Sequence, residues 1–302
     1  MFEVEGLKLV ELEIDKVLKS EVKVLEKASE HIVHSGGKRI RPALVLLANQ
    51  ACFGEDLKKT IPLAASVELI HTATLVHDDI NDGSKLRRGS PTVNSIWGKR
   101  VALLTGDFIL TKLFDLLSSY DRRIIEALVS TCTKIAEGET LQLMNLGRFD
   151  LSEKLYLKIV SKKTAALFSF CTEIGALLAD AEKTLVSILK IYGYNLGMAF
   201  QITDDLLDLV GEESELGKPI ENDLKQKKPS IATIHALKNG ATLDEIFSNP
   251  RKTLKVTGSL THSKKKALEF SERAKKNLHA LKDSDAKERL LELSDFVVSR
   301  KS

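Results

Sequence analysis

The chain has 302 residues, with 45 Lys and Arg against 42 Asp and Glu, which gives a formal net charge of +3. A charge so close to zero argues against a nucleic-acid-binding protein that depends on bulk positive charge. The three cysteines, Cys52, Cys132 and Cys171, stand apart without a CxxC pair, so we expect a protein of the reducing cytoplasm. The amino-terminal segment lacks a basic start and a continuous apolar run, and we expect no stable membrane insertion.

Apolar residues recur mostly at three- and four-residue spacing, which predicts an all-α protein. One such stripe runs from Leu7 to Leu25, and another from Leu185 to Leu196. Thr60 followed by Pro62 predicts a helix start, and the apolar run behind it continues to Asp82. Breaks are expected at 36–37, 54–56, 83–91, 147–148, 211–219, 228–229 and 249–250, where Gly or Pro occurs. No linker or repeat divides the chain, which predicts a single domain over residues 1–302.

Charge is unevenly distributed, because residues 251–302 carry 14 basic and seven acidic residues. Apolar residues keep helical spacing through this segment, for example at Leu278 and Leu290. The pattern is typical of a solvated helical face, and its function stays open.

Two segments each place three aspartates near the end of an apolar helix. They are HTATLVHDDIND, with Asp78, Asp79 and Asp82, and GMAFQITDDLLD, with Asp204, Asp205 and Asp208. Residues at i and i+4 share one helix face about 5 to 6 Å apart, so each trio is a patch of carboxylates that repel one another. A hard divalent cation such as Mg²⁺ would compensate this charge, since it takes carboxylates together with water and substrate phosphates. A solvated helix end explains one trio well, but two copies favour a metal–diphosphate site.

Phosphate oxygens bound in this way would attract Arg and Lys donors, and the chain has several short basic clusters. They are Lys38-Arg39-x-Arg41, Lys85-x-Arg87-Arg88, Lys162-Lys163, Lys218 and Lys225 to Lys228. Arg87 and Arg88 follow Asp82 after one short loop, which makes them the strongest candidates.

These motifs together resemble the trans-type polyprenyl diphosphate synthase family. The first motif is Asp78-Asp79-x-x-Asp82-x4-Arg87-Arg88-Gly89, and the second is Gln201-x-x-Asp204-Asp205-x-x-Asp208. Further landmarks occur in the family's order, namely Gly36-Gly37-Lys38-Arg39-x-Arg41-Pro42, Leu69 to Ala73, Gly106-Asp107, Gly138-Glu139 and Lys163-Thr164. The likeness runs from about Gly36 to Pro229. It implies an all-α bundle around a central cavity, the isoprenoid synthase type I fold, usually as a homodimer.

The resemblance also implies roles for single residues. Up to three Mg²⁺ ions would be held by Asp78, Asp82, Asp204 and Asp208, directly or through water, with Asp79 and Asp205 also in the catalytic set. The allylic diphosphate would be gripped by Arg87, Lys163, Lys218 and Lys228, while Thr164 and Gln201 would turn oxygen dipoles toward the allylic cation. Isopentenyl diphosphate would be held without metal by Lys38, Arg41, His71 and Arg88. The chain lacks the glycine that often precedes the lysine after the second motif, so Lys225, Lys227 and Lys228 all stay candidates.

Product length is expected to depend on the helix that ends at Asp78, because one helical turn rises about 5.4 Å, close to one isoprene unit. In the family, a bulky aromatic four or five positions before the first Asp stops growth early. Here these positions hold Thr74 and Ala73, and the next turn offers Ile70. We therefore expect a product of geranylgeranyl length or longer.

Three other functions stay open. One is a farnesyl diphosphate synthase, and another is a non-catalytic partner subunit of a prenyl synthase, although such a subunit should have lost some Asp or Arg positions. The third is a terpene cyclase or a head-to-head synthase, although cyclases usually replace the second DDxxD and lack the isopentenyl site around Lys38 and Arg41.

Overall fold

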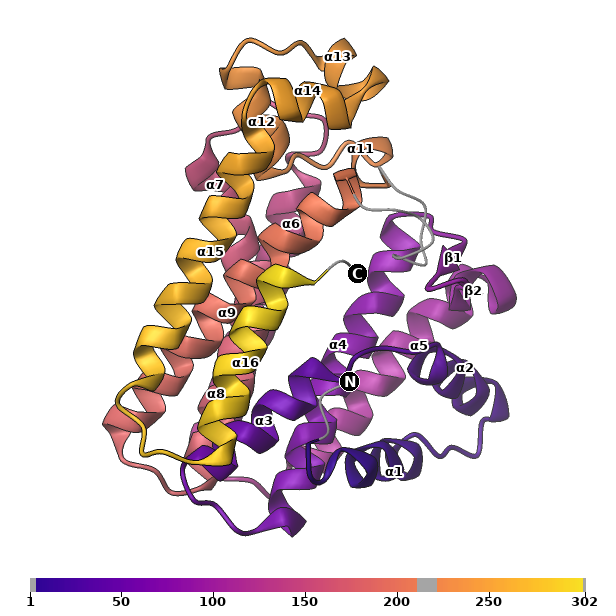
Figure 1. Ribbon diagram of the computed structural model, residues 1–302. Coiled ribbons are helices and arrows are strands. Elements are labelled where there is room, and N and C mark those ends of the chain that lie inside the picture. Colours follow the sequence, from indigo (N-terminus) through magenta and orange to yellow (C-terminus); the bar gives the residue numbers. More distant parts are fainter. Residues whose placement is uncertain (1–3, 211–221, 301–302) are drawn as a thin grey trace. The chain divides into compact units, whose positions relative to one another are not determined.

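The computed structural model describes residues 4–210 and 222–300, and these are helical almost throughout (Figure 1). The helices are α1 (Leu7–Val17), α2 (Lys23–His34), α3 (Ile40–Ala51), α4 (Leu57–Asn81), α5 (Val93–Leu117), α6 (Arg122–Leu143), α7 (Glu153–Val160), the π-helical turn η1 (Ser161–Ala165), α8 (Ala166–Leu178), α9 (Lys183–Val210), α11 (Asn222–Lys225), α12 (Ile231–Lys238), α13 (Leu243–Ser248), α14 (Pro250–Val256), α15 (Ser259–Leu278) and α16 (Asp285–Ser299). The all-α prediction is confirmed, with one small exception. Strands β1 (Leu86–Arg87) and β2 (Ser90–Pro91) form an antiparallel pair inside the segment that was expected to be a plain break.

The chain forms two compact units, which we call unit 1 (Met1–Glu126 with Ile174–Ala181) and unit 2 (Ala127–Glu173 with Glu182–Ser302). The single domain over residues 1–302 stays a prediction.

Unit 1 is built on α4 and α5, which pack along each other and carry α1, α2 and α3 (Figure 1). Its core consists of side chains with almost no exposed surface, among them Leu44, Leu47, Leu63 and Leu69. The long helix α4 ends at Asn81, with Asp82 as its C-cap. The first aspartate trio therefore lies on the last turn of a helix that is anchored along its length.

Unit 2 is built on α9, against which α15, α16 and η1 pack (Figure 1). One cluster of its core includes Tyr156, Met198, Ile202 and Ile234. The second aspartate trio lies on the last turns of α9, which gives it the same kind of support as the first.

Several helices begin at a residue whose side chain caps them. Ser152, Ser230 and Asn249 each accept a hydrogen bond from a backbone N–H of the helix that they precede. The predicted helix start at Thr60 is wrong, since α4 begins three residues earlier. Asp56 is the true cap, because its side chain accepts from the Lys59 N–H at 3.2 Å, and Pro62 lies inside the helix.

The stripe from Leu7 to Leu25 is also interrupted, because α1 ends at Val17 and α2 begins at Lys23. The helical spacing after residue 250 is confirmed in α15 and α16, with Leu281 in the turn between them. The expected break at 211–219 lies outside the described residues. Over the ranges 4–210 and 222–300, no helix is both long and apolar enough to cross a membrane.

Candidate active site

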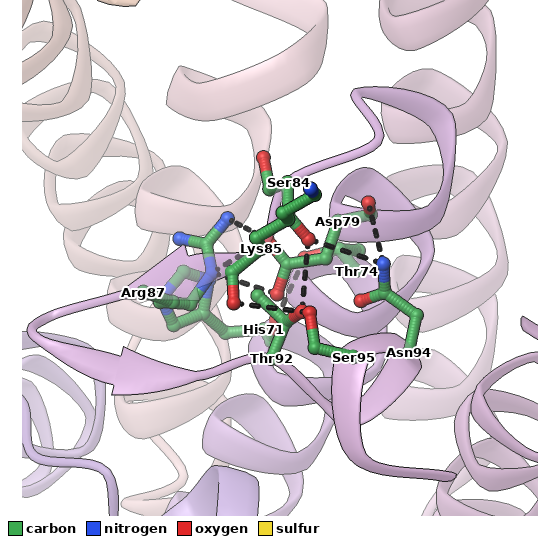
Figure 2. A network of polar contacts seen from close by, with 9 residues as sticks. All are labelled: His71, Thr74, Asp79, Ser84, Lys85, Arg87, Thr92, Asn94 and Ser95. Carbon is green, nitrogen blue, oxygen red and sulfur yellow. Dashed lines mark hydrogen bonds and ion pairs between the residues drawn. The ribbon is translucent and has the colours of Figure 1, made fainter. Parts of the chain in front are cut away.

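The first trio is fixed by an ion pair between Asp79 and Arg87, shown in Figure 2. Arg87 Nε donates to both carboxylate oxygens of Asp79 at 3.0 Å, and its Nη2 donates to Oδ1 at 2.8 Å. Asp79 is only 1% exposed, whereas Asp78 and Asp82 are partly buried. Burial raises the pKa of Asp79, and the hydrogen bond from Arg87 opposes that rise. The middle carboxylate of the trio is thus buried and paired with an arginine, whereas the other two are partly exposed.

The loop after the trio is held by the start of α5 (Figure 2). Thr92 Oγ1 donates to the Ser84 carbonyl at 2.8 Å, and Asn94 Nδ2 donates to the same oxygen at 3.1 Å. Ser95 Oγ donates to the Lys85 carbonyl at 3.0 Å. These bonds fix the base of the β1–β2 hairpin, from which Arg87 points back to Asp79.

Arg88, the next residue of the hairpin, reaches the glycine loop before α3. Its Nη1 donates to the Gly36 carbonyl, and a Cβ at Gly37 would lie 2.8 Å from that same nitrogen. Gly37 is therefore needed for this close approach, since a side chain would displace the guanidinium. The structure thereby brings together two motifs that lie about fifty residues apart in the sequence.

His71 lies among the guanidinium groups of unit 1. Burial lowers its pKa well below the usual value, and the positive charges of Arg41, Arg88 and Arg87 lower it further. Lys38 is exposed near the end of the loop that precedes α3. The residues expected to hold isopentenyl diphosphate thus lie in the loop before α3, on α3, on α4 and in the hairpin, and the charges of Arg41 and Arg88 both act on His71.

A buried ion pair that was not predicted from the sequence anchors the loop before α3. Arg39 Nη1 donates to Glu68 at 2.8 Å, and its Nη2 donates to the Val33 carbonyl at 2.8 Å. The Glu68 residue is 5% exposed. Arg39 adopts the left-handed conformation, with φ at 50°, at the N-cap of α3. A glutamate inside the apolar run of α4 was the signal that could have revealed the pair, since such a residue is rarely buried unless it is paired.

In the second trio, Asp204 meets the carboxyl-terminal segment. Arg300 Nη2 donates to Asp204 Oδ1 at 3.3 Å and to the Phe200 carbonyl at 3.0 Å. The guanidinium carbon of Arg300 lies 4.0 Å from the centre of the Phe200 ring, and the side chain is 5% exposed. Burial lowers the pKa of Arg300, while Asp204 opposes this. At least one basic side chain of residues 251–302 therefore forms an ion pair with the second aspartate motif.

Asp205 is held by two donors. Tyr156 Oη donates to Asp205 Oδ2 at 2.6 Å, and Gln201 Nε2 donates to Oδ1 at 2.6 Å. The pKa of Asp205 is raised to about 6, chiefly by burial and also by the neighbouring Asp204 and Asp208, while the two hydrogen bonds oppose the rise. Burial also raises the pKa of Tyr156 well above its usual value, so the phenol stays a donor. No local sequence pattern points to Tyr156, which lies 49 residues before Asp205.

Asp208, the last member, is fully buried and accepts from the Asp223 N–H at 2.9 Å. This bond joins α9 to the start of α11, the segment that carries the loop lysines. Lys228 is partly buried in that loop, whereas Lys225 and Lys227 are exposed. Lys218 lies outside the described residues.

Lys163 and Thr164 lie in η1, where the helix widens by one residue. Such π-helical turns often mark functional sites. Gly138 of α6 lies against this turn, since a Cβ there would be 2.5 Å from the Lys163 nitrogen. Lys163 forms an ion pair with Glu139 and donates to Gln142 Oε1 at 2.7 Å, while Thr164 Oγ1 donates to Gln201 Oε1 at 2.7 Å. The Gly138-Glu139 and Lys163-Thr164 landmarks are thus in contact.

The three positions expected to govern product length lie on α4. Ile70 and Ala73 are each 1% exposed, while Thr74 is partly buried and donates to the His71 carbonyl at 2.7 Å.

The donor set of both trios consists of carboxylate oxygens, the ligands that Mg²⁺ prefers. Among the described residues, no group of three or more His, Cys, Asp or Glu side chains is arranged to hold a metal ion. Since Mg²⁺ is usually held by one or two carboxylates plus substrate phosphates, the carboxylate oxygens of the trios fit an ion that is shared with a diphosphate.

The comparisons with known proteins agree with these features. A family model described as polyprenyl synthetase matches residues 22–262. The chain is 38% identical over 292 residues to a geranylgeranyl diphosphate synthase of Methanosarcina mazei, covering 91% of this chain and 90% of that protein. It is 39% identical over 305 residues to an all-trans-nonaprenyl-diphosphate synthase (geranyl-diphosphate specific) of Rhodobacter capsulatus, covering 95% and 92%.

The crystal structure of a polyprenyl synthase from Caulobacter crescentus, complexed with calcium and isoprenyl diphosphate, is similar with a TM-score of 0.93. Its sequence identity is 34%, over 98% of this chain and 95% of that one. On the family match and these similarities, the chain belongs to the polyprenyl synthetase family.

Proposed function

We propose that this chain is a Mg²⁺-dependent trans-prenyltransferase that joins isopentenyl diphosphate head-to-tail to an allylic diphosphate. One observation carries the proposal, namely that the aspartate trio at the end of α4 lies one hairpin away from a cluster of guanidinium groups. An acidic site beside a basic site suits two diphosphate substrates, one bound through metal ions and the other bound by basic side chains alone. Membership of the polyprenyl synthetase family supports it.

We assign the metal-free diphosphate site to Lys38, Arg41, His71 and Arg88. Burial lowers the pKa of His71 most, and the positive charges of Arg41 and Arg88 lower it further, so an anionic ligand would meet positive charge here. An anion with several oxygens offsets this charge and accepts hydrogen bonds from the planar guanidinium groups. Isopentenyl diphosphate is such an anion.

We assign the allylic diphosphate to the aspartate trios and their cations. Asp78, Asp82, Asp204 and Asp208 would hold up to three Mg²⁺ ions, and Arg87, Lys163, Lys218 and Lys228 would bind the remaining phosphate oxygens. Bound Mg²⁺ supplies positive charge that stabilises the diphosphate as it leaves.

In the reaction, the allylic C1–O bond breaks and its electron pair stays on the diphosphate oxygen. The double bond of isopentenyl diphosphate supplies the electron pair of the new C–C bond to C1. A proton then leaves C2 of the isopentenyl unit, which restores a double bond, and the released diphosphate accepts it. Thr164 and Gln201 turn oxygens toward the positive carbon in the meantime.

We propose a product of geranylgeranyl length or longer. The described turns of α4 before Asp78 carry small or aliphatic side chains, Thr74, Ala73 and Ile70. Relatives named as geranylgeranyl and nonaprenyl diphosphate synthases support this range. A farnesyl diphosphate synthase is the alternative for the product.

We further propose a cytoplasmic homodimer. Cys52, Cys132 and Cys171 carry free thiols, in keeping with a reducing compartment. Helix α5 exposes large apolar side chains that a second copy could cover, among them Leu103, Leu104 and Phe114.

The test is incorporation of labelled isopentenyl diphosphate by the purified protein alone, with geranyl or farnesyl diphosphate as primer. We expect incorporation that requires Mg²⁺ and is lost with EDTA, and chromatography of the dephosphorylated products should give geranylgeraniol or longer alcohols. Farnesol as the sole product would identify a farnesyl synthase. No incorporation with any primer would favour the non-catalytic subunit, and a cyclic hydrocarbon would favour a cyclase.

A further inference from the structure

A chain of hydrogen bonds in unit 2 runs from a buried phenol to the threonine of η1. Tyr156 Oη and Gln201 Nε2 each donate to Asp205 at 2.6 Å, and Thr164 Oγ1 donates to Gln201 Oε1 at 2.7 Å. Tyr156 and Thr164 are 3% and 7% exposed. Both ends of this series of hydrogen bonds are therefore sheltered from water, so water does not readily replace its donors and acceptors.

The donors and acceptors leave only one direction for these bonds. A carboxylate only accepts, so Gln201 must turn its amide nitrogen toward Asp205 and its oxygen toward Thr164. The hydroxyl hydrogen of Thr164 is then used in the bond to Gln201. What remains on Thr164 Oγ1 is lone-pair electron density, so this hydroxyl can accept but not donate.

We infer that Tyr156 is a positioning residue which, through Asp205 and Gln201, fixes Thr164 as a pure acceptor for positive charge on the substrate. Tyr156 holds Oδ2 of Asp205, and thereby keeps Oδ1 at the distance that orients the Gln201 amide. The inference rests on the proposed function, in which an allylic carbon becomes positive near Thr164. It also gives Asp205 a role other than metal binding, since both its oxygens accept from protein donors.

The test is Tyr156→Phe, which removes the hydroxyl and keeps the ring. Binding of two inhibitors of equal chain length is measured by calorimetry, an ammonium analogue of the allylic cation and a neutral thioether analogue. We expect the ammonium compound to bind about tenfold more weakly, in line with the loss of one oriented oxygen dipole, and the thioether within about twofold of the wild type. In turnover, kcat should fall while KM for isopentenyl diphosphate stays unchanged.

Tyr192→Phe is the matched control, because Tyr192 is a second buried phenol of unit 2, whose hydroxyl donates to the Leu290 carbonyl at 2.7 Å. It should leave both inhibitors unaffected. Equal weakening of both inhibitors in Tyr156→Phe, as general loosening would produce, overturns the inference.

A double-mutant cycle with Thr164→Val separates positioning from stability. Once Thr164 has no hydroxyl, adding Tyr156→Phe should not weaken the ammonium compound further. Additive losses would contradict the inference.

Should Tyr156→Phe fold poorly, Asp205→Asn is the second variant. It replaces the carboxylate by an amide that can donate as well as accept, so the Gln201 amide nitrogen is no longer forced toward residue 205 and Thr164 is no longer fixed as an acceptor. Weaker binding of the ammonium compound than of the thioether is again expected, and unchanged selectivity would overturn the inference. Because both inhibitors are measured without turnover, a wild-type protein without incorporation would contradict only the proposed reaction.

Discussion

Thr74 lies one turn before Asp78 on α4, and its side chain is partly buried, whereas that of Ala73 is almost fully buried. A phenyl ring is therefore easier to accommodate at Thr74. We expect Thr74→Phe to shorten the main product by at least one isoprene unit, because one turn rises about 5.4 Å, close to the length of that unit. Chromatography of dephosphorylated products measures this, with Thr74→Val as a control of similar volume. An unchanged product distribution would show that α4 does not limit growth here.

Arg300 supports Asp204 with a buried guanidinium that also stacks on Phe200. Removing the charge by Arg300→Gln should destabilise the metal-free protein by about 1 kcal/mol, since Asp204 loses a charged donor while its 41% exposed side chain stays partly hydrated. Mg²⁺ with inorganic diphosphate should shrink this difference, because the metal then compensates Asp204. Thermal unfolding in EDTA and in Mg²⁺ tests both points, with Arg300→Lys as the control that keeps the charge. A difference of the same size in both buffers would mean that Arg300 and the metal act independently.

For single residues, the sequence was sufficient to find the six aspartates, because their spacing i, i+1, i+4 can be read directly from it. It could not show that Asp79, Asp205 and Asp208 already accept hydrogen bonds from protein groups. Tyr156 lies 49 residues before Asp205, and Arg300 lies 96 residues after Asp204. Side chains so far apart meet only through packing, so no local pattern reveals them.

The turn η1 is the element that presents Lys163 and Thr164, and it depends on a glycine in α6. A Cβ at Gly138 would lie 2.5 Å from the Lys163 nitrogen and 2.9 Å from the Lys162 carbonyl carbon, and backbone atoms cannot move aside cheaply. We expect Gly138→Ala to cost about 1–3 kcal/mol of stability through overpacking, and to lower kcat at least tenfold by shifting η1.

Unfolding in urea and steady-state kinetics check this prediction. Ala136→Ser is the control, since Ala136 is exposed on the same helix. Wild-type kcat in Gly138→Ala would show that η1 tolerates the shift, and the role of the close approach would be disproved.

Among the elements, helices were predicted well where a cap or an apolar face was local. The break expected at 249–250 lies between α13 and α14, where Asn249 caps α14 and Pro250 begins it. The π-helical turn and the two-residue strands were not predicted. Neither has a period of its own: η1 lies in close contact with Gly138 of another helix, and the strands are defined by pairing between Arg87 and Ser90.

For the whole molecule, the exposed apolar face of α5 allows a test of the oligomeric state. Leu103, Leu104 and Phe114 are 51%, 57% and 57% exposed. If a second copy covers this face, the protein should have twice the chain mass of 33.4 kDa, and Leu104→Arg should reduce it to one chain. Light scattering after gel filtration measures the mass. Leu12→Arg, at a 65% exposed leucine of α1, is the control that should leave the dimer intact. A dimeric Leu104→Arg protein would place the interface elsewhere.

The sequence by itself determined the helical class, the order of the motifs and the chemistry of two carboxylate patches with basic partners. These properties depend on residue type and on spacing within one or two helical turns, which the printed chain contains. Only the tertiary structure decided that three side chains each donate a hydrogen bond to a different aspartate, namely Arg87, Tyr156 and Arg300. It also decided that Arg39 pairs with Glu68. The physical reason is that a buried charge or hydroxyl must find a partner wherever packing brings one, and that choice depends on the fold as a whole.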